Sequence, residues 1–368
     1  MVFFPPVLSP NHFYTLASWP FTGLSAKGTG LRIVVFLLLV SIAGCTPSKE
    51  VRLQQFLLKG NGALKEQNTA EASRYFDEAL KLDPCFVDAL NNLGTISFQS
   101  HNWEEAKKYY DRAIACDPTY LPAYFNRVNT NIELKEYYAA MEDVKRIKQA
   151  KPDTMVVYFA EGLVATRLRN YDDALTAFDR AIAMDSANAE LLVNRGTVNY
   201  YRRKFDEAEA DLKKAEYINA AEANIYNTRA MIAIARGDQD AALKEIEKAL
   251  AISPNQPYFV NNRGFVLLMQ NKLAEGLTEI DRSILMDPDN GWAYRNKGVY
   301  YLLNGDYGRA IKLLSQAIDR DPYVERTHFY LGMAYLKNNE KQKACKEFVI
   351  SDRAGDAMVT PDLMKSCR

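Results

Sequence analysis

The residues of this chain that could do chemistry are few, and their types exclude most catalytic arrangements. The 368 residues include five cysteines and three histidines, His12, His101 and His328. So few histidines make a histidine metal cluster or a Ser/His/Asp relay hard to build. No CxxC motif and no glycine-rich phosphate loop occurs in the sequence, so neither a zinc site nor phosphate chemistry is indicated. We therefore expect no enzymatic activity, no metal, no cofactor and no small-molecule substrate.

One cysteine, Cys45, stands where an apolar run ends and a polar stretch begins. The run from Ile33 to Ala43 has eleven residues, about half of the roughly 20 that a helix needs to cross a bilayer. A basic residue, Arg32, precedes the run, and small residues close it. A short apolar core with these flanks is typical of an export signal. The alternative is an uncleaved hydrophobic anchor with an incidental cysteine.

The four residues IAGC, which end at Cys45, resemble the lipobox of bacterial lipoproteins. The resemblance implies that Cys45 receives a diacylglycerol and becomes the first residue after cleavage. Residues 31–44 are then a lipoprotein signal peptide, and residues 45–52 are the lipidated cysteine and a short linker. Residues 1–30 show no helical or strand period. We hypothesise that translation starts at Leu31 through a non-ATG initiator, so that residues 1–30 are a non-native or disordered leader.

The chain is nearly neutral without its first 44 residues. The full sequence has 46 basic and 46 acidic side chains, and residues 1–44 hold two of the basic ones, Lys27 and Arg32, and none of the acidic ones. The remainder has 44 basic against 46 acidic groups, a formal charge of about −2. Nucleic-acid binding needs a concentrated basic face. We therefore expect protein or extended-peptide partners and no nucleic acid.

Small residues and prolines recur through the chain with a period of 34. The first series runs without an insertion through Ala72, Ala106, Ala140, Ala174, Ala208, Ala242, Gly276, Ala310 and Ala344. The second series consists of Gly60, Gly94, Gly162, Gly196, Gly264, Gly298 and Gly332, with Val128 and Ala230 at the two other places. The third series consists of Pro84, Pro118, Pro152, Pro254, Pro288 and Pro322.

Each 34-residue period predicts two helices that fold back on each other. Between the three series, apolar residues fall at helical spacing with charged residues on the other side, as in ALNNLGTISF and AKKYYDRAIACDP. Small side chains permit a close helix crossing. Proline ends the second helix because it lacks an N–H and disfavours the α region in the residue before it. The fourth and fifth repeats carry Ser186 and Ala220 instead, so we expect their second helices to fray or run on.

The 34-residue unit, with glycine at position 8, alanine at positions 20 and 27 and proline at position 32, resembles the tetratricopeptide repeat. Nine copies cover residues 53–358. The resemblance implies an all-α fold, a right-handed superhelical solenoid of about nine helical hairpins in which each hairpin buries its apolar face against its neighbours. Residues 359–368 then form a capping segment over the last repeat.

Four further cysteines, Cys85, Cys116, Cys345 and Cys367, are an even number in an oxidising compartment. Cys85 and Cys116 lie at the same end of one hairpin, so a disulfide between them is geometrically possible. In the alternative, Cys116 fills a small core slot, since its position in other repeats holds apolar residues: Leu82, Met184, Ile218, Ile252 and Met286. A bridge from Cys345 to Cys367 would attach the cap to the last repeat.

An asparagine recurs at position 6 of the repeat, in the first helix: Asn92, Asn126, Asn194, Asn262 and Asn296. A carboxamide offers a donor and an acceptor, which match the backbone of an extended peptide. The row resembles the asparagine ladder in the repeat domain of the O-linked N-acetylglucosamine transferase, although Ala160, Thr228 and Tyr330 interrupt it. In the alternative, these amides bond to adjacent helices or reflect the repeat consensus.

Aromatic side chains beside this row could anchor a partner, because large rigid rings give much contact area for little entropy lost. Tyr258 and Trp292 are such residues, and Arg295 beside Trp292 offers a guanidinium for a carboxylate. We therefore expect the eighth repeat to hold the best-equipped local patch for a partner.

These features favour a membrane-tethered scaffold, similar to bacterial tetratricopeptide lipoproteins that help assemble cell-envelope machinery. The alternative is a periplasmic holdase-like chaperone that captures extended polypeptides through the asparagine row. Because Thr46, not aspartate, follows the cysteine, we expect a lipid anchor in the outer membrane of a bacterial envelope, facing the periplasm.

Overall fold

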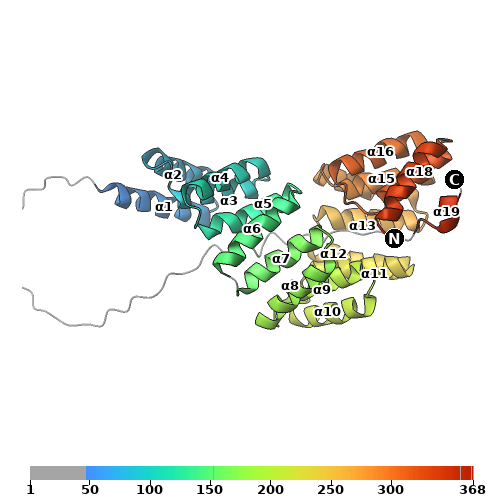
Figure 1. The fold of residues 1–368 in the computed structure, drawn as a ribbon, viewed down its shortest axis with the longest axis horizontal. Coiled ribbons are helices and arrows are strands. Elements are labelled where there is room, and N and C mark those ends of the chain that lie inside the picture. Colours follow the sequence, from blue (N-terminus) through green and yellow to red (C-terminus); the bar gives the residue numbers. More distant parts are fainter. Residues whose placement is uncertain (1–46, 152, 357, 366, 368) are drawn as a thin grey trace, which may run out of the picture. The chain divides into compact units, whose positions relative to one another are not determined.

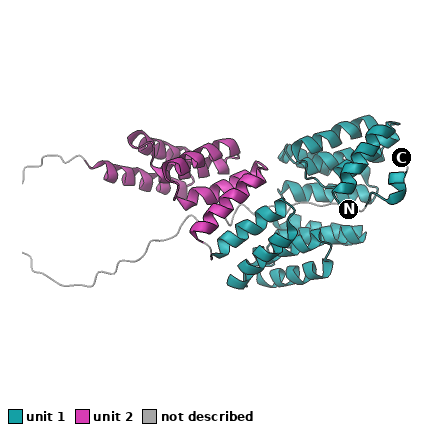
Figure 2. Ribbon diagram, in the orientation of Figure 1, with its two compact units in different colours: residues 1–7, 154–368 teal, residues 8–153 magenta. Residues whose placement is uncertain are grey.

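The computed structural model describes residues 47–151, 153–356, 358–365 and 367. Over these residues the chain is all-α, with 19 helices and no strand (Figure 1). It divides into two compact units, which we call the N-terminal unit, up to Asp153, and the C-terminal unit, from Thr154 (Figure 2). Within each unit, consecutive helices pair as hairpins. The all-α fold and the array of helical hairpins are therefore confirmed.

The helix bounds follow the 34-residue period. The N-terminal unit contains α1 (Lys49–Lys65), α2 (Thr69–Leu82), α3 (Val87–Gln99), α4 (Trp103–Cys116), α5 (Leu121–Glu133) and α6 (Tyr137–Ala150). The C-terminal unit contains α7 (Met155–Arg167), α8 (Tyr171–Met184), α9 (Ala189–Tyr201), α10 (Phe205–Ile218), α11 (Ala223–Arg236), α12 (Gln239–Ile252), α13 (Pro257–Met269), α14 (Leu273–Met286), α15 (Gly291–Leu303), α16 (Tyr307–Arg320), α17 (Thr327–Lys337), α18 (Lys341–Arg353) and α19 (Pro361–Lys365). We call the odd-numbered helices α1 to α17 first helices and the even-numbered ones second helices.

The recurring small residues allow the two helices of a hairpin to cross closely. A Cβ added at Gly94 of α3 would lie 2.5 Å from the ring of Tyr110 in α4. One added at Gly264 of α13 would lie 2.9 Å from the backbone oxygen of Gly276 in α14. Interiors are packed too densely to absorb such overlaps without a shift. Glycine is therefore a steric requirement of these crossings.

The turn inside each of the nine hairpins places one residue in the left-handed region. Seven of these residues are not glycine and have φ between 59° and 63°: Gln67, His101, Lys135, Arg169, Arg203, Asn271 and Asn339. The next residue donates its N–H to the carbonyl five positions earlier, as from Asn102 to Ser97 at 2.9 Å. A left-handed residue with such a bond satisfies the last carbonyls of the first helix.

The second helices of the fourth and fifth repeats end on time without proline. Helices α8 and α10 stop at Met184 and Ile218, in the same register as the helices that proline follows. The expectation that they fray or run on is therefore wrong. The side chains of Asp185 and Asn219 accept hydrogen bonds from the backbone N–H two residues further on, at 3.2 and 3.1 Å. These local turns stabilise the exit from the helix where proline is missing.

The structure refines the predicted boundaries at both ends of the repeat array. Helix α1 begins at Lys49, so residues 49–52, which we expected to be linker, belong to the first helix. Ser48 caps it by accepting a hydrogen bond from the N–H of Val51 at 3.3 Å. At the other end, Leu363 of α19 packs against a buried cluster that includes Phe348 of α18. Residues after α18 thus cover part of the last hairpin.

No helix among the described residues is long and apolar enough to cross a membrane. Cys45 and the apolar run before it lie outside the described residues.

Candidate protein-binding surfaces

Four of the five asparagines of the predicted row bond to the first helix of the preceding repeat. Within the described chain, four amide nitrogens donate to an asparagine Oδ1 of the preceding repeat: Asn92 to Asn61 at 3.0 Å, Asn126 to Asn91 at 2.9 Å, Asn262 to Asn227 at 2.7 Å and Asn296 to Asn261 at 2.9 Å. In three of the four pairs, position 6 of one repeat donates to position 5 of the repeat before it. Asn194 has Phe159 at the matching place and donates to the carbonyl of Glu190 in its own helix, at 2.8 Å. The alternative stated from sequence, bonding to adjacent helices, therefore describes most of the row.

Burial divides the row between the two units. Asn262 and Asn296 are 1% and 0% exposed, and Asn194 is also buried. The expectation that these three amides contact a partner is wrong for the structure as it stands, because no partner could reach them. Asn92 and Asn126, both in the N-terminal unit, are half-buried. They remain candidates for contact with a peptide.

Arginines at position 7 of the repeat join neighbouring hairpins. Each pairs with an acidic residue in the second helix of the preceding repeat and with another in the second helix of its own repeat. The pairs are Arg127 with Asp111 and Asp143, Arg195 with Asp179 and Asp211, and Arg263 with Glu247 and Glu279. Burial raises the pKa of Asp143, and this effect is larger than the lowering by the hydrogen bonds from Arg127. These ion pairs fix the stacking of the repeats and leave those arginines little capacity for a partner.

The patch predicted in the eighth repeat is buried. Arg295 is fully buried, and Trp292 is 6% exposed. The guanidinium of Arg295 lies 5.3, 5.2 and 5.9 Å from the ring centroids of Phe265, Trp292 and Tyr330. Tyr258 is half-buried and packs against the cluster that contains Trp292. The prediction that Arg295 and Trp292 form an accessible patch is therefore wrong: both are core residues of the C-terminal unit.

A four-residue segment of the same unit contributes to this burial. We call Tyr323, Val324, Glu325 and Arg326 the clasp segment. Val324 is buried in one cluster with Tyr200 of α9, Phe265 and Trp292. Arg169, in the turn between α7 and α8, donates to the carbonyl of Tyr323 at 2.6 Å and lies 3.8 Å from the Glu325 carboxylate.

Sequence reasoning missed the clasp segment, although a signal exists. Position 1 of the first eight repeats holds an apolar or small residue: Leu53, Val87, Leu121, Met155, Ala189, Ala223, Pro257 and Gly291. The ninth repeat has a carboxylate there, Glu325. A charged residue at a position that is otherwise apolar or small marks a break in the pattern.

Burial perturbs the ionisable groups around the clasp segment. It raises the pKa of Glu325 to about 7, against the opposing charges of Arg169 and Arg295. It lowers the pKa of Arg295 itself to about 10. In the first turn of α9, burial raises the pKa of Glu190 to about 7, with a further contribution from the charge of Glu222.

The C-terminal unit also has exposed apolar side chains, which we call the outer row. They lie in the last turns of four consecutive second helices: Met184 of α8, Tyr217 and Ile218 of α10, Ile252 of α12 and Leu285 of α14. Tyr217 is 93% and Leu285 84% exposed. Because exposed apolar side chains recur at the same place in successive repeats, this row is a candidate interaction site. The exposure of Met184, Ile218 and Ile252 also shows that the position of Cys116 is not a core slot in those repeats.

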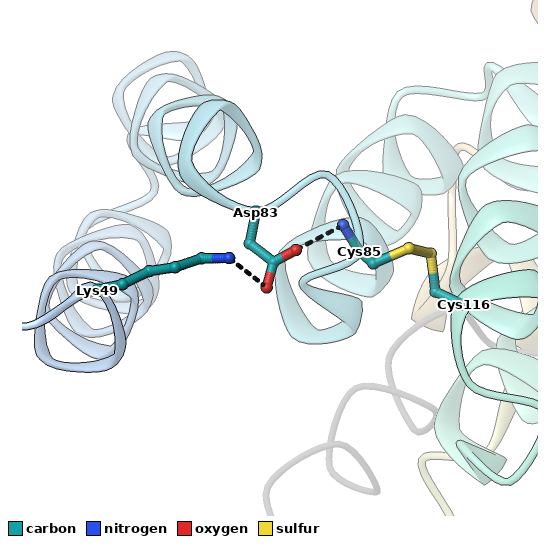
Figure 3. Close-up of a disulfide and its surroundings, with 4 residues drawn as sticks. All are labelled: Lys49, Asp83, Cys85 and Cys116. Atoms are coloured by element: carbon teal, nitrogen blue, oxygen red, sulfur yellow. Dashed lines mark hydrogen bonds and ion pairs between the residues drawn. A yellow bond between two sulfur atoms is a disulfide. The ribbon is translucent and has the colours of Figure 1, made fainter.

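The four remaining cysteines form two disulfides. Cys85 bonds to Cys116 and Cys345 to Cys367, each with 5.4 Å between the Cα atoms. Figure 3 shows the first bridge beside Asp83, which accepts the N–H of Cys85 at 3.1 Å and pairs with Lys49 of α1 at 3.4 Å. The second bridge joins α18 to the segment after α19. Among the described residues no group of three or more His, Cys, Asp or Glu side chains is arranged to hold a metal ion.

Comparison with known proteins agrees with this architecture. Models described as "Tetratricopeptide repeat" match residues 57–120, 159–225 and 305–349, and further ones match 280–312 and 223–256. Together these matches cover more than half of the sequence. The chain belongs to the tetratricopeptide repeat family. Such a repeat array provides surfaces for protein–protein interaction.

Solved structures show the same fold at low sequence identity. The chain is similar to one in the crystal structure of the APC/C hetero-tetramer Cut9-Hcn1, with a TM-score of 0.58 and 16% identity, over 82% of this chain and 59% of that one. It is also similar to a monomeric mutant of IFIT1 with Gppp-AAAA, with a TM-score of 0.57 and 14% identity, over 85% of this chain and 80% of that one. The chain thus spans 59% of the length of its Cut9-Hcn1 neighbour. No curated protein matches the sequence.

Proposed function

We propose that this protein is a lipid-tethered scaffold of the bacterial cell envelope, which holds folded partner proteins on the outer row of its C-terminal unit. The observation that carries the proposal is the outer row itself. Large apolar side chains that lie mostly in solvent give up few contacts when a partner binds, and they contribute much of the binding energy of an interface. Tyr217 and Leu285 are such residues.

The two disulfides support the proposed location of the repeats in the bacterial periplasm. Disulfides form and persist in oxidising environments such as the bacterial periplasm and are rare in the cytosol. Of the five cysteines, four are paired, and only Cys45 is left for another chemistry. Its place after a short apolar run fits lipid attachment at the outer membrane, with the repeats in the periplasm.

The structure weighs against the holdase alternative. A chaperone that binds extended chains through the asparagine row needs the amides of that row to be free. In the C-terminal unit the amides of Asn194, Asn262 and Asn296 are buried, and those of Asn262 and Asn296 bond to the first helix of the preceding repeat. A partner that docks on the outer row does not need them.

The tether can be tested by mass spectrometry and fractionation of the protein made in bacterial cells. We expect a mature N-terminus at an acylated Cys45 and a protein in the membrane fraction. The Cys45→Ala variant should lose the lipid and leave that fraction. An unlipidated wild-type protein would contradict the proposed tether.

The docking surface can be tested by photo-crosslinking in living cells from position 217 or 285. We expect one or two specific proteins to be captured, and the same proteins to be lost when Tyr217 and Leu285 are both replaced by serine. Position 138 offers a matched control, because Tyr138 of α6 is 74% exposed but lies in the N-terminal unit. Capture of the same partners from position 138 alone would contradict the assignment to the outer row.

A further inference from the structure

We propose that the clasp segment is an autoinhibitory ligand: it occupies, inside its own unit, a binding site for an extended acidic peptide. The site is formed by Arg169 and Arg295, which both donate to backbone carbonyls of the clasp segment. This inference goes beyond the scaffold function, because it concerns residues that the outer row does not include.

The clasp segment departs from the repeat in backbone as well as in sequence. The first helices of repeats two to eight all begin at position 1 of the repeat. Helix α17 begins two residues later, at Thr327, because Arg326 has φ of 61° in the left-handed region. A non-glycine residue with this backbone conformation costs free energy that its surroundings must offset. The segment is therefore held away from the helix by its contacts.

Those contacts are of the kind that a bound peptide makes. Arg169 donates to the backbone carbonyl of Tyr323 at 2.6 Å and pairs with the Glu325 carboxylate at 3.8 Å. Arg295 donates to the backbone carbonyl of Glu325 at 3.3 Å. Arginine binds backbone and carboxylate oxygens through several directed donors. The contact between Arg169 and Tyr323 joins residues 154 positions apart, so it closes the unit on itself.

Helix α13 holds two unsatisfied amide atoms beside the hydrogen-bond network of Arg295, which donates to Asn296, the donor to Asn261. Within the described chain, Nδ2 of Asn261 and Oδ1 of Asn262 are buried without a hydrogen-bond partner. Both side chains are at most 1% exposed. A buried donor or acceptor without a partner is unfavourable. The closed state therefore carries a cost that an opened state could relieve.

The charges around Glu325 define the class of ligand. The groups that face its carboxylate come from the turn after α7, the turn after α9, helix α15 and the residues after α18: Arg169, Arg203, Arg295 and Asp356. Three tyrosines also lie near it: the buried Tyr200 and the half-buried Tyr171 and Tyr201. Asp356 pairs with Arg326 of the clasp segment at 3.7 Å, so the charges of Arg169, Arg203 and Arg295 are those that Glu325 offsets. A peptide that replaces the clasp segment should therefore supply a carboxylate.

Opening of the clasp can be measured by hydrogen exchange of the full chain. We expect Arg169→Ala to speed exchange in residues 321–330 by about 10-fold or more, because a hydrogen bond to a charged group contributes about that factor. Acrylamide quenching of Trp292 should rise in the same variant, measured with Trp19 and Trp103 replaced by phenylalanine. Arg236→Ala is the matched control, since it removes a surface ion pair with Asp206 in the same unit. Arg169→Lys, which keeps the charge without the fork, should lie between Arg169→Ala and the wild type.

The ligand class can be tested with a synthetic copy of residues 319–328, DRDPYVERTH. The chain with Val324→Ser and Glu325→Gln, which weakens its own clasp, should bind this peptide at least 10-fold more tightly than the wild type does. Adding Arg169→Ala, or replacing the glutamate of the peptide by glutamine, should abolish that gain.

Two results would overturn the inference. Exchange in residues 321–330 that is the same in Arg169→Ala as in Arg236→Ala would show that no releasable clasp exists. Binding that does not depend on the peptide glutamate, or that the wild type shows equally, would refute an autoinhibited site for acidic peptides. Neither result depends on the outer row or on the lipid, so the scaffold function would stand or fall separately.

Discussion

Replacement of Asn262 by alanine should destabilise the C-terminal unit by about 2 kcal/mol. The change removes the 2.7 Å hydrogen bond to Asn227 and leaves Oδ1 of Asn227, in a side chain only 1% exposed, without its donor. A hydrogen bond contributes about 0.5–1.5 kcal/mol net, and a buried polar atom without a partner costs about 1–3 kcal/mol. Because Oδ1 of Asn262 itself lacks a partner, its removal offsets part of the loss.

A double-mutant cycle with Asn227→Ala isolates the pair. The loss in free energy of unfolding should be smaller in the double variant than the sum of the two single losses, by at least about 1 kcal/mol, because both unsatisfied atoms are then gone. Urea unfolding followed by circular dichroism gives the free energies. Hydrogen exchange must assign them to the C-terminal unit, because a repeat array need not unfold in one step.

The N-terminal unit contains a natural control for this experiment. Asn92 makes the same type of bond, at 3.0 Å to Asn61, but both side chains are half-buried. Water can replace the lost partner there, so Asn92→Ala should cost less than about 1 kcal/mol. Equal losses in Asn92→Ala and Asn262→Ala, or strict additivity in the cycle, would refute the view that burial makes these amide bonds decisive.

Three further predictions concern other parts of the chain. Burial raises the pKa of Glu190 to about 7. The stability that protonated Glu190 contributes is therefore fully present below about pH 4.5 and is lost as the pH rises to 7, and this loss is at most about 3 kcal/mol. Glu190→Gln should flatten the fall in melting temperature between pH 5 and 8. Gly94→Ala should destabilise by about 1–3 kcal/mol through its clash. Gly62→Ala, in the last turn of α1 with open space around it, should stabilise by about 0.5–1 kcal/mol; urea midpoints compare the two. Replacing Cys345 and Cys367 by serine should cost about 3 kcal/mol on the chain-entropy estimate and speed hydrogen exchange in residues 358–367, unless the cap is held by packing alone.

The hairpins could be predicted because their requirements are local. Gly94 must be small where it meets Tyr110, and this steric need recurs every 34 residues. The ends of the second helices could be predicted less well. Asp185 and Asn219 end their helices through turns of their own side chains, which a search for proline alone does not detect.

The partners of the recurring polar residues could not be predicted. The sequence shows that Asn262 recurs in register, but the choice between a peptide and Asn227 depends on how neighbouring first helices face each other. The cysteine pairing was open for the same reason, since a disulfide needs Cα atoms within a short distance and only the fold brings Cys85 and Cys116 to 5.4 Å.

The sequence by itself determined the all-α repeat array, because a period of small and apolar residues encodes contacts between helices that are adjacent in the chain. Only the tertiary structure decided which faces a partner can reach. Arg169 meets Tyr323 across 154 residues, and Val324, the next residue, packs in the buried cluster that contains Trp292. A contact between such distant residues depends on the summed geometry of all the repeats between them, which no single repeat records.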